Sequence, residues 1–123
     1  SALIIDWDRL EELEHDLNTD QLRTALIQFR SDLDQFMTDA SHWLQKSIDR
    51  KTLSEEAHRM AGSAGVFGAM RLTNQMRNLQ TEAKTATPSA LNDLVAEVKI
   101  SWKLTRTELD KVDALPITEI ERS

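Results

Sequence analysis

The stretch TDQLRTALIQFRSDLDQFMTDASHWLQK, residues 19–46, decides the fold. Its apolar positions follow one another at alternating steps of four and three residues, as they do on one face of a helix. These positions are Leu22, Leu26, Phe29, Leu33, Phe36, Ala40 and Trp43. The spacing predicts a long helix that ends near Lys46, and its apolar face requires other helices to cover it.

The flanking residues predict a helix on each side of this long one. Before it, Asp6 can cap a short helix over residues 6–16. The apolar residues of that helix are Trp7, Leu10, Leu13 and Leu17. After it, Thr52 and Glu55 form the pattern of a capping box, which predicts the start of a third helix. The third apolar stripe comprises Leu53, Ala57, Met60, Ala61 and Ala64.

Two further helices complete the predicted set. A helical pattern made of Leu72, Met76, Leu79 and Ala83 stops at the polar residues 85–88. Thr87 as a cap and Pro88 at the first helical position predict the last helix. Pro116 is expected to end regular structure, within a tail that is irregular after about residue 113.

The composition agrees with a helical domain. The 123 residues are enough for one domain, and we assign residues 1–123 to it. The chain has only 3 glycines and 2 prolines, so it has little material for hairpin turns. We therefore predict an all-α fold, namely an antiparallel up-down four-helix bundle with a short N-terminal lead-in helix.

Composition and charge also exclude several functions. The absence of cysteine excludes disulfides, thiolate metal sites and cysteine nucleophiles. A net charge of −6 argues against nucleic acid as a partner. No apolar run approaches the roughly 18 residues that span a bilayer, so we expect a cytoplasmic protein without a membrane segment. His15 and His42 are isolated, and the acidic residues of segment 6–16 lack the spacing of a calcium loop, so we expect no metal site.

All three glycines, Gly62, Gly65 and Gly68, lie within ten residues of His58. A glycine inside a helix costs about 0.8–1 kcal/mol relative to alanine, so the bare surface near His58 needs a reason. Around the helix axis, Gly62 lies about 40° and Gly65 about 20° from His58. Either another protein approaches His58 closely, or two helices pack closely there. His58 lies at the margin of the apolar stripe of this helix, which favours an exposed imidazole. Gly68 is expected to end the helix in a left-handed conformation.

Residues 57–69, AHRMAGSAGVFGA, together with Leu72 and Leu79, resemble the signature of histidine-containing phosphotransfer (HPt) domains. That signature reads A-H-x-L-K-G-S-[SA]-x-x-[LF]-G. The resemblance implies a four-helix bundle in which His58 accepts a phosphoryl group from a receiver-domain aspartate or a partner kinase. His58 would then pass the group to another receiver aspartate. A free imidazole, with a pKa of about 6.5, is largely neutral and nucleophilic at pH 7.

The resemblance also implies the partners. It implies response-regulator receiver domains and a sensor histidine kinase, and a phosphoryl carrier without kinase activity of its own. No cofactor is expected in this chain, because Mg²⁺ is expected on the partner receiver domain. We expect the carrier to be a monomer.

The supporting residues follow from the resemblance position by position. Many family members have a lysine three residues after the histidine, whereas this chain has Ala61. Gln80 and Lys84 are expected beside His58 on the next helix, with Gln80 fixing which ring nitrogen attacks. The expected supporting and docking residues are Arg59, Ala61, Gly62, Gly65, Gln80 and Lys84.

The charge is unevenly distributed along the chain. Residues 50–84 have six basic and three acidic side chains, a net charge of +3, whereas the rest of the chain has −9. This asymmetry could steer an acidic partner toward His58.

Two alternatives remain open at the level of sequence. The chain could be a helical adaptor that binds receiver or kinase domains without phosphotransfer, as the missing lysine would permit. It could also be the phospho-acceptor domain of a larger chemotaxis-type kinase, because residues 65–68, GVFG, are similar to that branch of the family.

Overall fold

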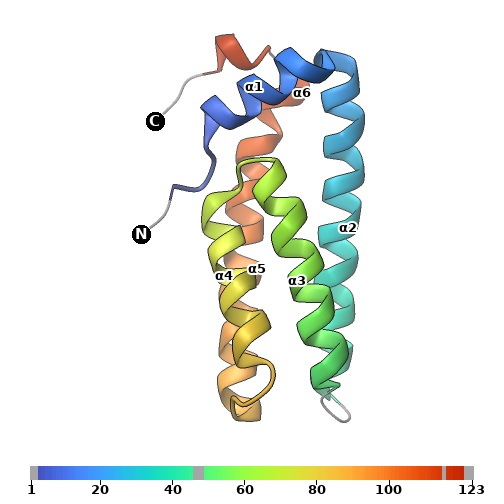
Figure 1. The fold of residues 1–123 in the computed structure, drawn as a ribbon, viewed down its shortest axis with the longest axis vertical. Helices are drawn as coiled ribbons and strands as arrows, with labels where there is room; N and C mark the ends of the chain where they lie inside the picture. Colours follow the sequence, from blue (N-terminus) through green and yellow to red (C-terminus); the bar gives the residue numbers. More distant parts are fainter. Residues whose placement is uncertain (1–2, 46–48, 115, 121–123) are drawn as a thin grey trace.

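The computed structural model describes residues 3–45, 49–114 and 116–120, and within these ranges it contains helices and no strand. The elements are α1 (Trp7–Leu17), α2 (Thr19–Gln45), α3 (Arg50–Val66), α4 (Met70–Glu82), α5 (Pro88–Leu109), α6 (Lys111–Ala114) and the 3₁₀ turn η1 (Ile117–Glu119). Helices α2 to α5 run alternately up and down, and α1 lies across the upper end of the bundle (Figure 1). The predicted all-α fold is confirmed, and the predicted end of the long helix at Lys46 lies outside the described residues.

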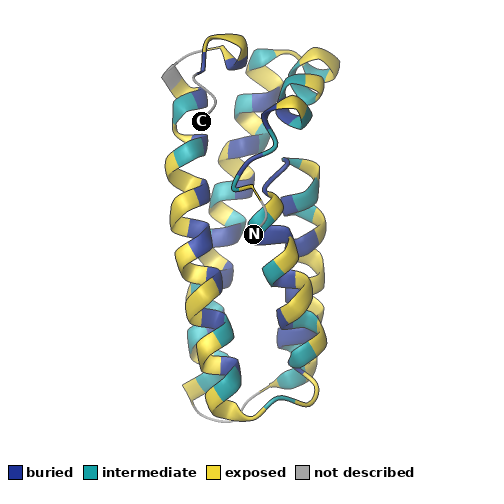
Figure 2. Cartoon of the chain, turned by 90° about the vertical axis from the view of Figure 1, so that its left-hand side faces the viewer, coloured by how far each residue is buried: buried dark blue, intermediate teal, exposed yellow. Residues whose placement is uncertain are grey.

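The apolar stripes predicted from the sequence meet in one core. The largest fully buried side chains are Leu10, Leu22, Leu26, Leu33, Leu53, Met60, Leu72, Met76, Leu79, Leu91, Leu109 and Ile117. Phe29 contacts two other aromatic rings, Phe67 at a centroid distance of 4.8 Å and Trp102 at 5.6 Å. Figure 2 shows the buried residues turned inward along the whole length of the bundle.

The helix starts are capped as predicted at two places and differently at a third. The side chain of Asp6 accepts from the backbone N–H of Arg9. The hydroxyl of Thr87 accepts from the backbone N–H of Ala90 in the first turn of α5. For α3, the predicted capping box at Thr52 is wrong. Asp49 caps this helix, because its carboxylate accepts from the backbone N–H of Thr52 at 3.0 Å and from the Thr52 hydroxyl at 2.8 Å.

The C-terminal tail is more regular than predicted. Val112, Ile117 and Ile120 are buried, and η1 packs against α1. Pro116 precedes this 3₁₀ turn, so the prediction that it ends regular structure is wrong. The side chain of Arg30 holds the junction of α5 and α6, because it donates to the carbonyl of Leu109 at 2.8 Å and pairs with Asp110 and Asp113. Residues 116–120 are ordered because Ile117 and Ile120 cover the end of the bundle.

Candidate functional site

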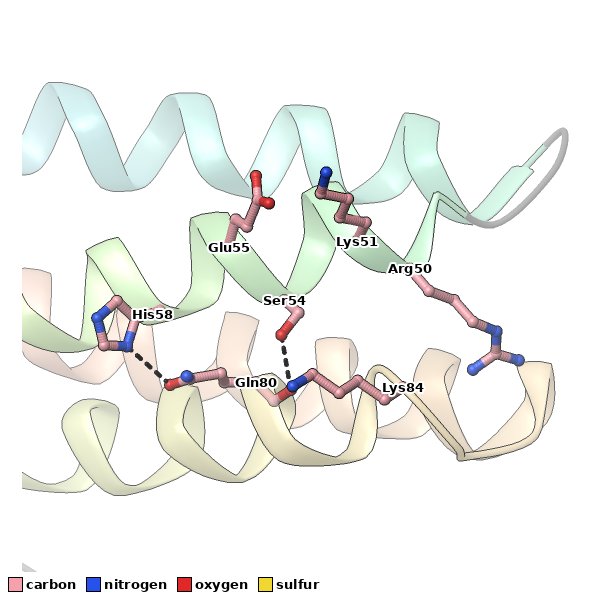
Figure 3. Close-up of a pocket in the computed structure, with 7 residues that line it drawn as sticks. All are labelled: Arg50, Lys51, Ser54, Glu55, His58, Gln80 and Lys84. Atoms are coloured by element: carbon pink, nitrogen blue, oxygen red, sulfur yellow. Dashed lines mark hydrogen bonds between the residues drawn. The ribbon is translucent and has the colours of Figure 1, made fainter.

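His58 lies in the middle of α3 with its imidazole exposed, as the sequence predicts. Its Nδ1 atom is 3.2 Å from Oε1 of Gln80 on α4 (Figure 3). The Ser54 hydroxyl, one turn earlier on α3, donates to the backbone carbonyl of Gln80 at 3.0 Å. This bond ties the backbone at Gln80 to α3, so the position of the amide beside the imidazole is fixed by the packing of the two helices.

A pocket of about 630 Å³ opens beside His58 between α3 and α4. It is lined by Arg50, Lys51, Ser54, Glu55, His58, Gln80 and Lys84 (Figure 3). Three of these side chains are cationic and one is a carboxylate, so the pocket favours an anion. The Arg50 guanidinium is held at the pocket by donating to the carbonyl of Ala83 at 3.0 Å. The Lys84 side chain runs back along α4 toward Gln80 (Figure 3).

The predicted supporting residues divide into two groups. Gln80 and Lys84 line the pocket with His58. Gln80 lies on α4 as predicted, whereas the prediction that Lys84 lies on this helix is wrong, because α4 ends at Glu82 and Lys84 lies in the turn that follows. Ala61 is only 4% exposed and faces the core, whereas Arg59 is exposed and pairs with Glu56 one turn back, with 2.8 Å between Nη2 and Oε2. Neither Ala61 nor Arg59 is among the described residues that line the pocket.

The glycines near His58 differ in what surrounds them. Apart from the adjacent residues and backbone of α3 itself, a Cβ atom at Gly62 would have no heavy atom of the described residues within 4 Å, and one at Gly65 would meet only the methyl group of Thr73, at 4.0 Å. Close helix packing therefore explains neither glycine, and the surface beside His58 is bare. Gly68 has φ +69°, which confirms the left-handed end of α3.

Sequence reasoning missed part of the pocket. From the sequence, Arg50 and Lys51 count only toward the net charge of residues 50–84, and Glu55 only toward that charge and the predicted capping box. Ser54 is not singled out, and none of the four is predicted beside His58. A signal was available, because Ser54, Glu55 and Lys51 precede His58 by four, three and seven residues, which places them near one face of a helix. The part of the pocket formed by α4 depends on how the two helices pack.

The described residues hold no group of three or more histidines and carboxylates that could bind a metal ion. The expectation that Mg²⁺ belongs to the partner is not tested by this finding and stays a prediction. Among the described residues, none of the helices is both long enough and apolar enough to cross a bilayer.

The fold and the site define a class of protein: a helical bundle with an exposed histidine on one of its long helices, held by a glutamine of the next. The model of the Hpt domain family matches residues 24–114, and the chain belongs to this family. No curated protein matches the chain in sequence. Hpt domains are phosphocarrier modules, so the chain is a phosphotransfer-type domain of two-component signalling, a family that interacts with receiver domains and kinases.

Proposed function

We propose that His58 accepts a phosphoryl group from the aspartyl phosphate of a receiver domain, or from a sensor kinase, and passes it to another receiver aspartate. The observation that carries this proposal is an exposed imidazole held by Gln80 beside a cationic pocket. The bare surface at Gly62 leaves room for the backbone of a partner to approach this imidazole.

The contact with Gln80 selects the attacking nitrogen. Because Oε1 of Gln80 only accepts hydrogen bonds, Nδ1 of His58 carries the proton in this contact. The lone pair then lies on Nε2, at the outer edge of the ring. In the transfer, the Nε2–phosphorus bond forms while the bond between phosphorus and the aspartate oxygen breaks, and the aspartate leaves as a carboxylate. The reverse reaction on a second receiver restores the neutral imidazole.

The pocket supplies part of the charge that the phosphoryl oxygens need. Phosphoryl transfer requires mainly in-line positioning and neutralisation of the oxygens. Lys84, Lys51 and Arg50 line the pocket, and they compensate in this chain for the missing lysine at position 61. The Mg²⁺ ion of the partner receiver would supply the remaining charge. In this proposal the domain acts in the cytoplasm as a monomeric carrier without kinase activity of its own.

One alternative is favoured by a specific observation. Ala61 stands where many relatives have a lysine, and it is buried, so no cation projects from this position. A domain that had lost phosphotransfer in this way would still bind receiver or kinase domains as an adaptor.

The test is transfer from a panel of phosphorylated receiver domains to the wild-type protein, to the His58→Gln variant and to the His42→Gln variant. His42 is an exposed histidine of α2 outside the pocket, so it serves as a matched control. We expect an acid-labile, alkali-stable label on the wild type and on His42→Gln, and none on His58→Gln. Binding of a receiver without any label would overturn phosphotransfer and support the adaptor.

A further inference from the structure

Three polar contacts join α3 to the end of α4 beside the pocket. On α3 the contacts come from Arg50, Ser54 and His58, which follow one another at steps of four residues and so lie along one side of the helix. His58 meets the side chain of Gln80, and Ser54 meets the backbone carbonyl of the same residue (Figure 3). Arg50 meets the carbonyl of Ala83, three residues further along the chain. The contacts therefore run in order along both antiparallel helices.

Two of these contacts reach carbonyls that α4 itself leaves open. Helix α4 ends at Glu82 and Ala83 is its C-cap, so the carbonyls of Gln80 and Ala83 lie where a helix has no amide of its own left to bond them. The hydroxyl of Ser54 donates to the first carbonyl at 3.0 Å, and Nη1 of Arg50 donates to the second at 3.0 Å. Side chains of α3 thus cap the C-terminal end of α4.

The hydroxyl of Ser54 is directed differently from those of the buried threonines Thr73 and Thr105. Each of these threonines donates to the carbonyl four residues back on its own helix, at 2.8 Å and 2.7 Å. That is a common bond for a hydroxyl inside a helix. Ser54 is 7% exposed and donates across to α4 instead. Because little water reaches a side chain buried to this degree, the capping of the Gln80 carbonyl depends on a hydroxyl at position 54.

The capped end of α4 carries two residues of the pocket. Gln80 lies in the last turn of α4, and Lys84 lies in the turn that follows. Helix ends open more readily than helix centres. One capped carbonyl belongs to Gln80 itself, and the other belongs to the residue before Lys84. The two caps therefore hold the segment from which both side chains reach the pocket.

We propose that Ser54 and Arg50 are positioning residues for the transfer. By capping the end of α4 they hold the amide of Gln80 against Nδ1 of His58, which keeps the ring proton on Nδ1 and the lone pair on Nε2. Ser54 has no charge and acts only through Gln80, whereas Arg50 adds this role to the charge that it brings to the pocket. The inference rests on the function proposed for His58.

The first test compares Ser54→Ala with the wild type. We expect the ¹⁵N chemical shifts of the His58 ring to move toward those of a mixture of tautomers, and transfer from the receiver that labels His58 fastest to slow by about 2–5-fold. Affinity for that receiver should stay unchanged, because the buried hydroxyl contacts α4. Ser54→Thr keeps the hydroxyl and should restore the shifts and the rate. Ser101→Ala is the matched control, because it removes a hydroxyl that is 3% exposed on α5, outside the pocket of His58.

A second comparison asks whether Ser54 acts through Gln80. In the Gln80→Leu background the amide is absent, so Ser54→Ala should produce no further change in the ring shifts or in the transfer rate. An equal change in both backgrounds would mean that the hydroxyl acts on His58 by another route, and would overturn the inference.

Arg50 is tested at the end of α4 itself. Arg50→Met and Lys51→Met each remove one cation from the pocket, but among the described residues only the first of these cations donates to the end of α4. The backbone amides of Ala83 and Ala86, which donate to the preceding turn, report the opening of this end by hydrogen exchange. We expect exchange to be about 3–10-fold faster in Arg50→Met than in Lys51→Met. Equal exchange in the two variants would overturn the role of Arg50.

These measurements keep the inference separate from the proposed function. The ring shifts and the hydrogen exchange need no receiver, and thermal unfolding by circular dichroism checks that every variant folds. Ring shifts of Ser54→Ala identical to those of the wild type overturn the inference, while the label on His58 persists and the proposed function stands. A panel in which no receiver labels His58 overturns the proposed function, whereas the ring shifts still show whether Ser54 holds Gln80 in place.

Discussion

Gly62 and Gly68 are six residues apart, yet their surroundings are opposite. A Cβ atom at Gly62 would have no heavy atom of the described residues within 4 Å beyond its own part of α3, whereas one at Gly68 would lie 2.8 Å from the carbonyl oxygen of Asp6. Gly62 is helical and exposed, and Gly68 is buried with φ +69°. The space at Gly68 is filled by the N-terminal segment, while the space at Gly62 is empty.

The difference between the two sites shows that the fold requires a glycine at position 68 but not at position 62. The fold needs a glycine at Gly68 for the close approach of Asp6 and for the left-handed turn. At Gly62 a glycine costs about 0.8–1 kcal/mol relative to alanine and makes no closer contact possible within this chain. The proposed function accounts for this glycine, because it leaves room for a partner to approach His58.

Gly68→Ala should give the largest effect on stability. The new methyl group would clash with Asp6, and the residue would be forced into the left-handed region, so we expect a loss of about 2–4 kcal/mol. Urea unfolding followed by circular dichroism measures it. Gly68→Asn is the informative companion, because asparagine tolerates a positive φ but carries the same Cβ atom. If Gly68→Asn is as stable as the wild type, the clash with Asp6 is not the reason for the glycine.

Gly62→Leu should have the opposite signature. Leucine has the higher helix propensity and its Cβ atom meets nothing, so we expect stability to rise by about 0.5–1 kcal/mol. The added side chain covers the approach to His58, so transfer from a receiver should fall by about tenfold or more. Parallel urea unfolding and transfer assays measure both quantities. An unchanged transfer rate would show that the bare surface is not used.

Gln80→Leu tests whether the site beside Gly62 depends on how the His58 ring is held. Loss of the 3.2 Å contact with Nδ1 should release the imidazole to either tautomer and slow transfer by about 2–10-fold. The ¹⁵N chemical shifts of the His58 ring report the tautomer directly. Asn78→Leu, at an exposed position of the same helix, is the control for a general effect of the substitution. Identical ring shifts in the wild type and Gln80→Leu would exclude a positioning role for Gln80.

The features of the fold that depend on local sequence were predictable. The long helix α2 follows from the spacing of apolar residues in its own sequence, and the caps at Asp6 and Thr87 follow from the residues next to them. The structure contains all three features. The 3₁₀ turn η1 was not predictable, because Ile117 and Ile120 become buried only once the end of the bundle has formed.

The site divides in the same way. His58 was predicted to be exposed because it lies at the margin of the apolar residues of α3, and it is exposed. Gly68 was predicted to be left-handed because the helical pattern ends there, and its φ is positive. The pocket does not follow from either, because Arg50 and Lys84 come together only when α4 packs antiparallel to α3. The cap of α3 was missed for a third reason. Asp49 and Thr52 are both good caps, and the choice between them depends on where the first helical turn begins.

Asp49→Asn should give the smallest effect, and its pH dependence tests how the first turn of α3 is held. The backbone N–H of Thr52, then its hydroxyl, and the nearby Lys51 lower the pKa of the Asp49 carboxyl below its ordinary value of 3.8. A carboxyl with a lowered pKa stabilises the folded state above the unfolded value, and this stabilisation is lost as the pH falls through the folded value. The advantage of the wild type over Asp49→Asn should therefore be constant above about pH 5 and shrink below about pH 4.

Urea unfolding of both proteins between about pH 2.5 and pH 7 measures this difference. The difference should be small, because Asp49 is exposed and asparagine is itself a good cap. Gly68 closes the other end of α3 through buried backbone contacts and its variants retain Asp49, so the stability difference between the wild type and Gly68→Ala should not change with pH over this range. If the advantage of the wild type persists undiminished at the lowest pH, the charge of Asp49 does not stabilise α3, and the cap acts through its neutral hydrogen bonds alone.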